Sequence, residues 1–578
     1  RQLGTASPDE LKEVLLSSPL RDGRLDEALV QHANAVSSRH VQLDPAVRLS
    51  LSDCLRPVHG AQAVSPPWAG FSDRDVRLRY GLLLAVDRAL LAALPLAYLG
   101  AGRIGGGSKW PGLSLGRLRS LLSYESKKSF LSQVINLTAT VNESDDKPKI
   151  RIDRSQTPIF RQQQGQTPAG SLPCSRESIA RTCFFSAYEQ LKQVDTRLLL
   201  TSSRDSVSLH IHFEGQSGAA AQGFGGPYRQ FLTDVCEELL SEHLPLFLRV
   251  PNAVMGGLDH TLANRDKFLP AHSSQSLLHL ELYQFVGRLM GLAIRTSVFL
   301  SLDLPSFFWK QLVGQPVSPA DISQIDQSFA RSLPLIRASK PSDWESSNSP
   351  SSSTSLGGDG SPGLMADLSF MTMLSDGTEM ELVPGGRHIQ VTHDNRLEYV
   401  ELVERARLTE IQAQLDSIRL GLSELVPVQV LEVFSWQELE RRICGDPLID
   451  IDILFQHTTY GRNTSEEQPH IRAFWEVLRS FDYDDRRKFL RFAWAQDRMP
   501  PAEGSWKMKI ETLQSPSPDS VWPKASTCFF ILQLPCYSSK QILHDRLVRA
   551  INEATIMEED PDPELRRGGN GGGGFVLN

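Results

Sequence analysis

The sequence is short of paired cysteines, of excess basic charge and of long apolar runs. Its seven cysteines in 578 residues include no CxxC pair. Structural zinc sites use closely spaced ligands, and disulfide-built domains are shorter and richer in cysteine. We therefore expect no metal or cofactor site, and reduced thiols that mostly behave as small buried hydrophobic groups. The seven are Cys54, Cys174, Cys183, Cys236, Cys444, Cys528 and Cys536.

Neither charge nor hydropathy points to a nucleic acid or a membrane. Lys+Arg 60 against Asp+Glu 68 gives a net charge of −8, and no basic stripe stands out, so we expect no nucleic-acid partner. The most apolar stretch, residues 81–100, carries Asp87 and Arg88 near its middle. Charges at mid-span are costly in lipid, so this stretch predicts an amphipathic soluble helix.

The N-terminus shows no signal-peptide pattern, and the chain begins at Arg1 rather than at Met. These features indicate a fragment or a processed product. We expect a cytoplasmic location, with the nucleus as the alternative.

The length allows several domains, since single domains usually hold about 100–200 residues. Residues 1–139 have a helical pattern, and residues 140–174 are polar and rich in proline, which predicts a linker. Residues 339–363 are rich in Ser, Gly and Pro, which predicts a disordered insertion. One helix face in the first region carries Leu83, Val86, Leu90, Leu91 and Leu94.

The most informative stretch surrounds Cys528. Phe529–Leu534 is aromatic and apolar and stops at Pro535, which predicts a short buried strand. Small residues precede Cys528 and predict a loop, so the thiol would stand where a loop enters a strand. From the residues alone, a reachable nucleophile and a buried cysteine at a strand end are equally compatible with this pattern.

Two other patterns predict local structure. The hydroxyl residues at 538 and 539 resemble a helix cap, and the apolar residues that follow share one helix face: Leu543, Leu547, Ala550 and Ile551. Residues 206–213 alternate as a strand should and put His210 and His212 on one face. A metal site there is conceivable, but no further His or Cys cluster completes it, so ordinary strand histidines are the simpler interpretation.

The segment around Cys528 resembles the active-site segment of HECT-type ubiquitin ligases, through Ser526-Thr-Cys528-Phe and Leu534-Pro-Cys-Tyr537-Ser-Ser-Lys. The resemblance covers about Ser175 to the C-terminus and indicates the C-terminal portion of a large family member. Other motifs occur in the family's order: Gly225-Gly-Pro-Tyr-Arg229-Gln-Phe231, Phe285-Val-Gly-Arg-Leu-Met-Gly291, Phe308-Trp-Lys-Gln-Leu-Val-Gly314, Val383-Pro-Gly-Gly-Arg387, Asn395-Arg-Leu-Glu-Tyr-Val400, Phe474-Trp-Glu476, Phe489-Leu-Arg-Phe492 and Arg498-Met-Pro500.

The resemblance implies an α+β fold of two lobes. A mostly helical N-lobe, residues 175–447, would carry a small subdomain that docks a ubiquitin-conjugating enzyme. An α/β C-lobe, residues 448–578, would carry the catalytic cysteine and end in a flexible acidic and Gly-rich tail. A hinge would join them near residues 444–449, where Gly445 and Pro447 suit a connection.

The implied activity is that of a ubiquitin-protein ligase. Cys528 would accept ubiquitin as a thioester from a conjugating enzyme and pass it to lysines of protein substrates. Thr527 would position the thioester, and Phe575 matches a phenylalanine that the family often places four residues from its C-terminus. The proton of the attacking lysine needs an acceptor, and the candidates are Asp519, Glu558, Glu559 and Asp560.

By position in the family, the groove that docks the conjugating enzyme would fall around Leu333, Leu335, Ile336 and Phe370. Apolar side chains at these positions are equally compatible with ordinary core packing. The resemblance therefore leaves two alternatives open for this set, a docking surface and a buried core.

The sequence also departs from the family. Ser526 stands where many members have histidine, and Ala221 and Gln222 stand where an acidic residue often precedes the Gly-Gly pair. These departures leave room for a catalytically degenerate HECT domain that acts as a ubiquitin-pathway binding scaffold. A cysteine hydrolase, the third alternative, needs a histidine by the thiol; His544 is the nearest downstream, and it falls in the predicted helix.

Overall fold

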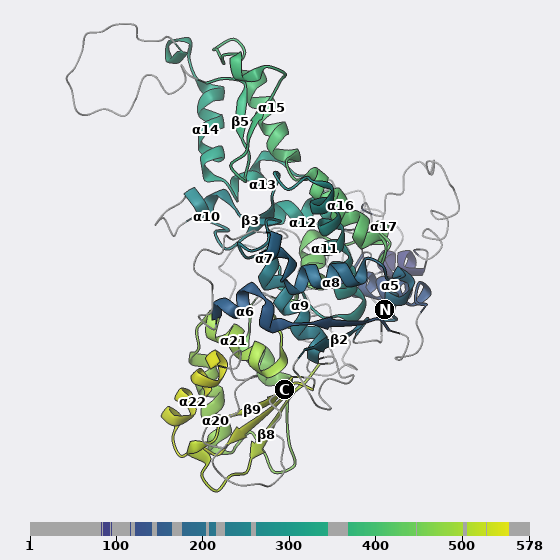
Figure 1. Ribbon diagram of the computed structural model, residues 1–578, viewed down its shortest axis with the longest axis vertical. Coiled ribbons are helices and arrows are strands. Elements are labelled where there is room, and N and C mark those ends of the chain that lie inside the picture. Colours follow the sequence, from purple (N-terminus) through teal and green to yellow (C-terminus); the bar gives the residue numbers. More distant parts are fainter. Residues whose placement is uncertain are drawn as a thin grey trace, which may run out of the picture.

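The computed structural model describes residues 83, 85–92, 94, 116, 119, 122–140, 147–163, 176–203, 207–214, 226–255, 262–344, 368–446, 448–500, 506–527 and 529–553. Its helices and small sheets make the predicted α+β fold, with a small subdomain at one end, a helical body and a mixed unit at the other end (Figure 1). Two hydrophobic cores are separate, one from Leu94 to Cys444 and one from Ile449 to Ile551. We call the described residues from 176 to 446 the N-lobe and those from 448 to 553 the C-lobe.

Two long helices form the centre of the N-lobe, α11 (Leu277–Thr296) and α16 (Gln412–Ser423). They approach so closely that only glycine fits between them. A Cβ atom on Gly287 would lie 1.9 Å from the carbonyl oxygen of Ile418, and one on Gly421 would lie 1.7 Å from a carbonyl oxygen of α11. This contact explains why two helices in the middle of the lobe carry glycine at a cost in helix propensity.

Further helices and a strand pair surround this pair of helices. The helices are α7 (Arg176–Ala180), α8 (Cys183–Leu191), α9 (Gly226–Leu239), α10 (Pro251–Met255), α12 (Ser306–Leu312), α13 (Pro319–Ser323), α17 (Val428–Leu431) and α18 (Trp436–Cys444). Strands β3 (Phe247–Arg249) and β4 (Phe268–Pro270) pair in antiparallel fashion. None of the helices in the described part of the chain is both long and apolar enough to span a bilayer.

The N-terminal region shares the core of the N-lobe. Helix α5 (Tyr124–Leu137) buries one face there, and Asp87 accepts hydrogen bonds from the backbone of Ser123 and the hydroxyl of Ser126, both at 2.8 Å. The helical face predicted before it is confirmed where it is described: Leu83 and Leu94 are buried, and Val86, Leu90 and Leu91 are half-buried.

The prediction of a linker over residues 140–174 is wrong for residues 149–163. Strand β1 (Lys149–Ile152) pairs in parallel with β2 (His210–Phe213), and it buries Ile150 and Ile152 in the N-lobe core. Helix α6 (Pro158–Gln163) follows. A four-residue strand is too short to give a clear alternating pattern, and its partner lies far along the chain. Strand β2 is shorter than predicted.

The small subdomain lies at the top of Figure 1 and contains α14 (Gln327–Ala338), β5 (Met371–Met373), β6 (Glu379–Glu381) and α15 (Arg396–Thr409). Part of the predicted insertion is ordered, because residues 341–344 form a 3₁₀ turn and the indole N–H of Trp344 donates to the Ser339 hydroxyl at 2.9 Å. The prediction is wrong for those residues, and 345–363 lie outside the described residues.

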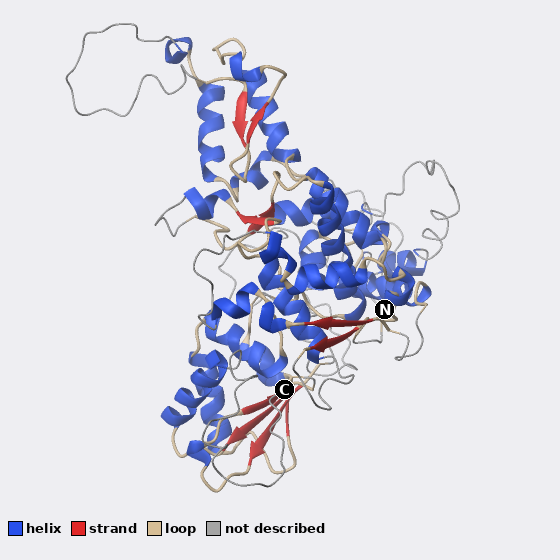
Figure 2. Ribbon diagram, viewed as in Figure 1, coloured by secondary structure: helices blue, strands red, loops and turns tan. Residues whose placement is uncertain are grey.

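The C-lobe is built on a four-stranded sheet of order β7-β8-β10-β9. Strands β7, β8 and β10 run parallel, and β9 runs antiparallel to β10. Figure 2 shows the helices gathered on one side of this sheet. The elements are α19 (Ile451–Gln456), β7 (Thr458–Tyr460), α20 (Pro469–Ser480), α21 (Tyr483–Trp494), β8 (Met508–Leu513), β9 (Lys524–Ser526), β10 (Ile531–Pro535) and α22 (Lys540–Glu553).

The helix predicted after Cys528 is confirmed as α22. All four residues of the predicted face are buried: Leu543, Leu547, Ala550 and Ile551. The hydroxyl of Ser539 accepts from the backbone N–H of Ile542 at 3.2 Å, as a cap residue does.

Candidate active site

The described residues on either side of the candidate nucleophile, Thr527, Phe529 and Phe530, lie in a tight turn between the antiparallel strands β9 and β10. Cys528 itself lies outside the described residues, but its neighbours are described. The strand predicted over Phe529–Leu534 is wrong at its first two residues, since β10 begins at Ile531. Phe530 has a φ of 52°, which a closing turn requires and an extended strand does not allow. Phe529 is 56% exposed, whereas Phe530 is buried.

A column of rings holds this turn from inside the C-lobe. The ring of Phe530 stacks on Trp494, the last residue of α21, with centroids 5.0 Å apart and planes within 12°. It also stacks on Trp506 at 6.2 Å, and Trp506 stacks on His457 at 4.2 Å. Ring pairs contribute about 0.5–1.5 kcal/mol each beyond their buried area, enough to offset a left-handed residue, which costs about 1–3 kcal/mol.

One arginine of the N-lobe contacts the same turn. Arg229, on α9, donates from Nη2 to the carbonyl oxygen of Thr527 at 2.9 Å. Its guanidinium also lies over the ring of Trp494, 5.8 Å from the centroid. Arg229 is buried, so water competes little for either contact. The residue before Cys528 is thereby linked to the N-lobe.

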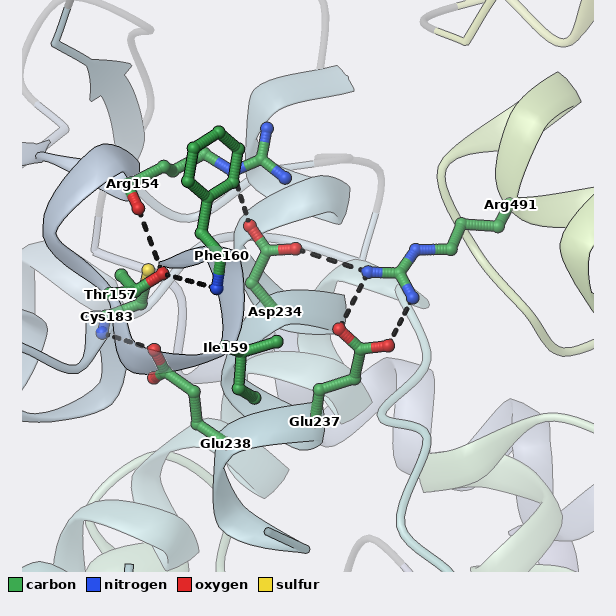
Figure 3. Close-up of a pocket in the computed structure, with 9 residues that line it drawn as sticks. All are labelled: Arg154, Thr157, Ile159, Phe160, Cys183, Asp234, Glu237, Glu238 and Arg491. Atoms are coloured by element: carbon green, nitrogen blue, oxygen red, sulfur yellow. Dashed lines mark hydrogen bonds and ion pairs between the residues drawn. The ribbon is translucent and has the colours of Figure 1, made fainter. Parts of the chain in front are cut away.

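Ion pairs join the lobes next to this contact. Figure 3 shows Arg491, from α21 of the C-lobe, reaching the carboxylates of Asp234 and Glu237 on α9. Its Nη2 lies 2.8 Å from Glu237 Oε2 and 3.5 Å from Asp234 Oδ1. Asp234 also pairs with Arg154 at 3.0 Å. Burial raises the pKa of Asp234, although the two arginines act to lower it.

A second group of polar contacts follows the end of α21. Arg498 pairs with Asp303 of the N-lobe at 2.6 Å, and Asp497 accepts from the hydroxyl of Ser301. The amide of Gln496 donates to the carbonyl oxygen of Phe299 at 3.1 Å. The lobes thus meet mainly through charged and polar groups.

The predicted hinge coincides with the break between the two cores. Gly445 has a φ of 72°, and a Cβ atom there would lie 2.8 Å from the carbonyl oxygen of Met499. Asp446 and Met499 exchange backbone hydrogen bonds of 2.9 and 3.0 Å. Pro447 lies outside the described residues.

The structure separates the four predicted docking residues. Leu333, Ile336 and Phe370 are buried in the small subdomain, and the ring of Phe370 packs edge-on against Tyr399 at 5.7 Å. Leu335 is 65% exposed. Core packing therefore accounts for Leu333, Ile336 and Phe370. Docking of a conjugating enzyme stays a prediction, and of the four residues only Leu335 offers it an exposed side chain.

The remaining predicted site residues have mixed outcomes. Thr527 is half-buried and its carbonyl accepts from Arg229. Asp519 accepts from both the backbone N–H and the hydroxyl of Ser538, at 2.8 and 2.6 Å, and these bonds lower the pKa of its carboxyl. Six further residues lie outside the described part of the chain: Ala221, Gln222, Glu558, Glu559, Asp560 and Phe575.

His544, the histidine considered for a hydrolase, makes its described contacts away from the turn around Cys528. His544 lies on α22, where its ring contacts the carboxylate of Asp545 and the ring of Phe481. His210 and His212 do share one half-buried face of β2, as predicted. Within the residues described, no group of three or more His, Cys, Asp or Glu side chains is arranged to hold a metal ion.

Sequence reasoning missed the role of three arginines. Arg229, Arg491 and Arg498 all fall inside motifs that resemble the family's, yet their letters say nothing about their partners. Each one contacts the opposite lobe in the structure. The signal available in the sequence was that each of these three basic residues occurs in a motif whose other residues are largely apolar.

Comparison with known proteins agrees with this architecture. A family model described as HECT-domain (ubiquitin-transferase) matches residues 233–559. E3 ubiquitin-protein ligase HERC2 of Mus musculus is 30% identical over 455 residues, covering 78% of this chain and 9% of that protein. Probable E3 ubiquitin-protein ligase HECTD4 of Homo sapiens is 30% identical over 574 residues, covering 93% of this chain and 13% of that protein. The chain thus spans a small part of these relatives, and it belongs to the HECT-domain (ubiquitin-transferase) family.

Proposed function

We propose that this chain is the catalytic region of a ubiquitin-protein ligase that carries ubiquitin as a thioester on Cys528 and transfers it to substrate lysines. One observation carries the proposal most strongly. The turn that includes Cys528 in sequence is held by a ring column from its own lobe and by Arg229 from the other lobe. A turn fixed from both lobes suits a group that must react in a defined position.

The chemistry is two acyl transfers. The Cys528 thiolate attacks the thioester carbonyl on the conjugating enzyme, and the thiolate of that enzyme leaves. A lysine amine then attacks the new thioester, an isopeptide bond forms and the Cys528 thiolate leaves. The first exchange is nearly balanced, whereas the second needs the amine, with a pKa of about 10.4, to lose a proton. Asp519 is a weak acceptor because its pKa is lowered.

The other described cysteines are poor candidates for this role. Burial raises the pKa of the thiols of Cys183, Cys236 and Cys444, so their reactive thiolate forms are disfavoured. Cys536 is exposed, but partial desolvation raises the pKa of its thiol as well. Its Sγ lies 3.8 Å from the ring nitrogens of His470. Cys536 is therefore the matched control position for the Cys528 variant.

The partners that follow are a ubiquitin-loaded conjugating enzyme, ubiquitin and protein substrates. We place the docking of the conjugating enzyme on the small subdomain, with Leu335 as its exposed apolar contact. Leu335→Asp should then slow loading of the chain about tenfold or more, because it puts a charge into an apolar contact. Leu420→Asp, at a residue of α16 that is 56% exposed, is the matched control and should load normally.

A thioester assay tests the proposed function. Activating enzyme, a panel of conjugating enzymes, ubiquitin and this chain are mixed, and products are run on gels with and without reductant. We expect a reductant-sensitive ubiquitin adduct that is lost in Cys528→Ala and kept in Cys536→Ala. No adduct with any conjugating enzyme, from folded protein, would instead favour the binding-scaffold alternative, and an adduct that survives Cys528→Ala would mean that another cysteine reacts.

A further inference from the structure

One stripe of helix α9 faces the C-lobe. Arg229 donates to the Thr527 carbonyl oxygen, and four residues later Thr233 donates from its hydroxyl to the Ala495 carbonyl oxygen at 3.1 Å. Another four residues along, Glu237 pairs with Arg491. This spacing of four residues puts all three side chains on one face of the helix. Helix α9 is therefore the surface of the N-lobe on which the reactive turn rests.

We infer that Arg229 is a positioning residue that holds the thioester-bearing turn during transfer of ubiquitin to lysine, and that it must release the turn during loading. The inference rests on the proposed function, since it assigns a role around the thioester of Cys528. Arg229 acts through Thr527 and Trp494 and is not itself assigned a contact with the reacting atoms.

The hydrogen bond acts on the peptide unit of the nucleophile. The carbonyl group of Thr527 and the backbone nitrogen of Cys528 belong to one planar peptide unit, so a donor that fixes the oxygen also fixes the orientation of that unit. A charged donor makes a stronger bond than a neutral one, and burial of Arg229 limits competition from water. The arginine therefore restricts the rotation of the backbone from which the thioester would extend.

The stacking contact acts on the part of the turn that follows the nucleophile in the sequence. The guanidinium of Arg229 lies over the ring of Trp494, and the ring of Phe530, two residues after Cys528, stacks on the same ring. Phe530 has the left-handed backbone that closes the turn. Arg229 thus bears on both ends of the turn, directly on the residue before the thiol and through Trp494 on the residue that closes it.

The position of these contacts assigns them to one step of the reaction. In Figure 1, α9 and the C-lobe lie on the side of the N-lobe away from the small subdomain, where we place the conjugating enzyme. To meet that enzyme, the turn must leave α9, and the bond between Arg229 and Thr527 must break. During the attack by lysine, which needs no conjugating enzyme, the contact can be made. Loading should therefore be independent of Arg229, and discharge should depend on it.

A single-turnover experiment separates the two steps. Loading is followed after a pulse of ubiquitin-charged conjugating enzyme, and discharge is followed after that enzyme is blocked and free L-lysine is added in excess. We expect Arg229→Ala to load within about twofold of the unaltered chain and to discharge about tenfold more slowly, as loss of a charge-assisted hydrogen bond implies. Arg229→Lys keeps a charged donor without the planar stack and should lie between the two.

The matched control is another arginine of the N-lobe that lies over a ring. Arg249 lies 5.0 Å from the centroid of Phe268, on the β3–β4 pair, and Arg249→Ala should change neither step. Normal loading by Arg229→Ala also shows that the variant is folded. Discharge at the unaltered rate would overturn the inference, and so would an equal slowing of loading and discharge. If the unaltered chain forms no thioester on Cys528, the proposed function fails first, which is a different result.

Discussion

The N-lobe makes two junctions of opposite character, one with helix α5 and one with the C-lobe. At the first, α5 contributes buried apolar side chains to the N-lobe core: Phe130, Leu131, Val134 and Ile135. At the second, the two cores stay separate, and the bridging side chains are mainly arginines, carboxylates and amides. The same body thus presents a mainly apolar surface to one neighbour and a polar surface to the other.

Polar groups at the α5 junction are deeply buried. Arg295 is fully buried and donates to the carbonyl oxygens of Thr201 at 2.6 Å and Leu425 at 2.8 Å, and to that of Ile135 at the end of α5. Burial lowers the pKa of Arg295 to about 10. Lys127 pairs with Glu438 at 2.8 Å. Breaking this junction would strand charged groups without partners, which is costly.

The difference between the two junctions indicates which of them can open. Apolar contacts that share one core are lost only when the core unfolds. The ion pairs and hydrogen bonds of the lobe junction become exposed to water when the lobes part, and water can then satisfy the same groups. We conclude that α5 is an integral part of the N-lobe, and we propose that the C-lobe can leave and return, as the proposed two-step chemistry requires.

The largest effect should come from cutting into the core at α5. Phe130→Ala should lower the free energy of unfolding by about 3–5 kcal/mol, because it removes a fully buried ring. Leu137→Ala, at a residue of the same helix that is 72% exposed, should change it little. Urea denaturation followed by circular dichroism measures both. Equal, small losses would show that α5 is only loosely attached.

The buried pair at the same junction should give the next largest effect. Lys127→Ala removes the ion-pair partner of Glu438, which keeps its hydrogen bond from the backbone N–H of Ser435, and should cost about 3 kcal/mol of unfolding free energy. Replacing both, as Lys127→Met with Glu438→Gln, should recover part of that loss, because no unpaired charge remains and the amide oxygen can still accept from Ser435. Chemical denaturation of the two singles and the double gives the coupling. A double variant less stable than Lys127→Ala would contradict this account.

Two neighbouring carboxyl groups on α9, one at the lobe junction and one buried inside the N-lobe, allow the comparison to be tested by changing the pH. Glu237 faces Arg491, whereas Glu238 is buried and accepts from the backbone N–H groups of Cys183 and Phe184, both at 2.8 Å. Burial raises the pKa of Glu238 from its ordinary value of 4.5 to about 8. The native state then holds a proton that the unfolded state has lost. Stability from this group is complete below pH 4.5 and is lost as the pH rises to about 8.

Glu238→Gln should remove that dependence. We expect the slope of the unfolding free energy between pH 5 and 8 to become flatter by about 1 kcal/mol per pH unit, close to the limit for one proton. Denaturation of the unaltered chain and of the variant at a series of pH values measures the slope. An unchanged slope in Glu238→Gln would mean that the carboxyl is ionised in the native state.

The smallest effect on stability should come from the lobe junction. Arg491→Ala should cost about 1 kcal/mol or less, because Glu237 is 36% exposed, so that water can replace the arginine, and because Asp234 keeps its pair with Arg154. It should nevertheless broaden the distribution of lobe arrangements, seen as a larger radius of gyration in X-ray scattering. Arg479→Ala, which breaks the pair with Asp452 inside the C-lobe, is the control and should change neither quantity. A loss near 3 kcal/mol would show that the two lobes unfold as one unit.

Prediction from sequence succeeded where the pattern is local or the motif is long. The buried face of α22 and the break near Gly445 could both be predicted, because each depends on consecutive residues. Strand β1 could not, because its partner β2 is about sixty residues away and a four-residue strand has little pattern of its own. The contact between Arg229 and Thr527 joins residues 298 positions apart, and no local signal encodes such a partner.

The docking set shows a different limit. Apolar letters at 333, 335, 336 and 370 were compatible with both a surface and a core, and only the burial of each side chain separates Leu335 from the other three. The turn at Phe530 shows a third limit, since an aromatic residue with a positive φ opposes the usual preference and is set by the ring column.

Amide hydrogen exchange tests the contrast between the junctions most directly. The backbone N–H of Met499 bonds to Asp446 across the lobe junction, and that of Thr140 bonds to Leu200 across the α5 junction, at 3.0 and 2.9 Å. We predict that Met499 exchanges at least about tenfold faster than Thr140, and faster still when ubiquitin-charged conjugating enzyme is present, while Thr140 exchanges only with global unfolding. Equal protection of the two amides, unchanged by the conjugating enzyme, would contradict the account.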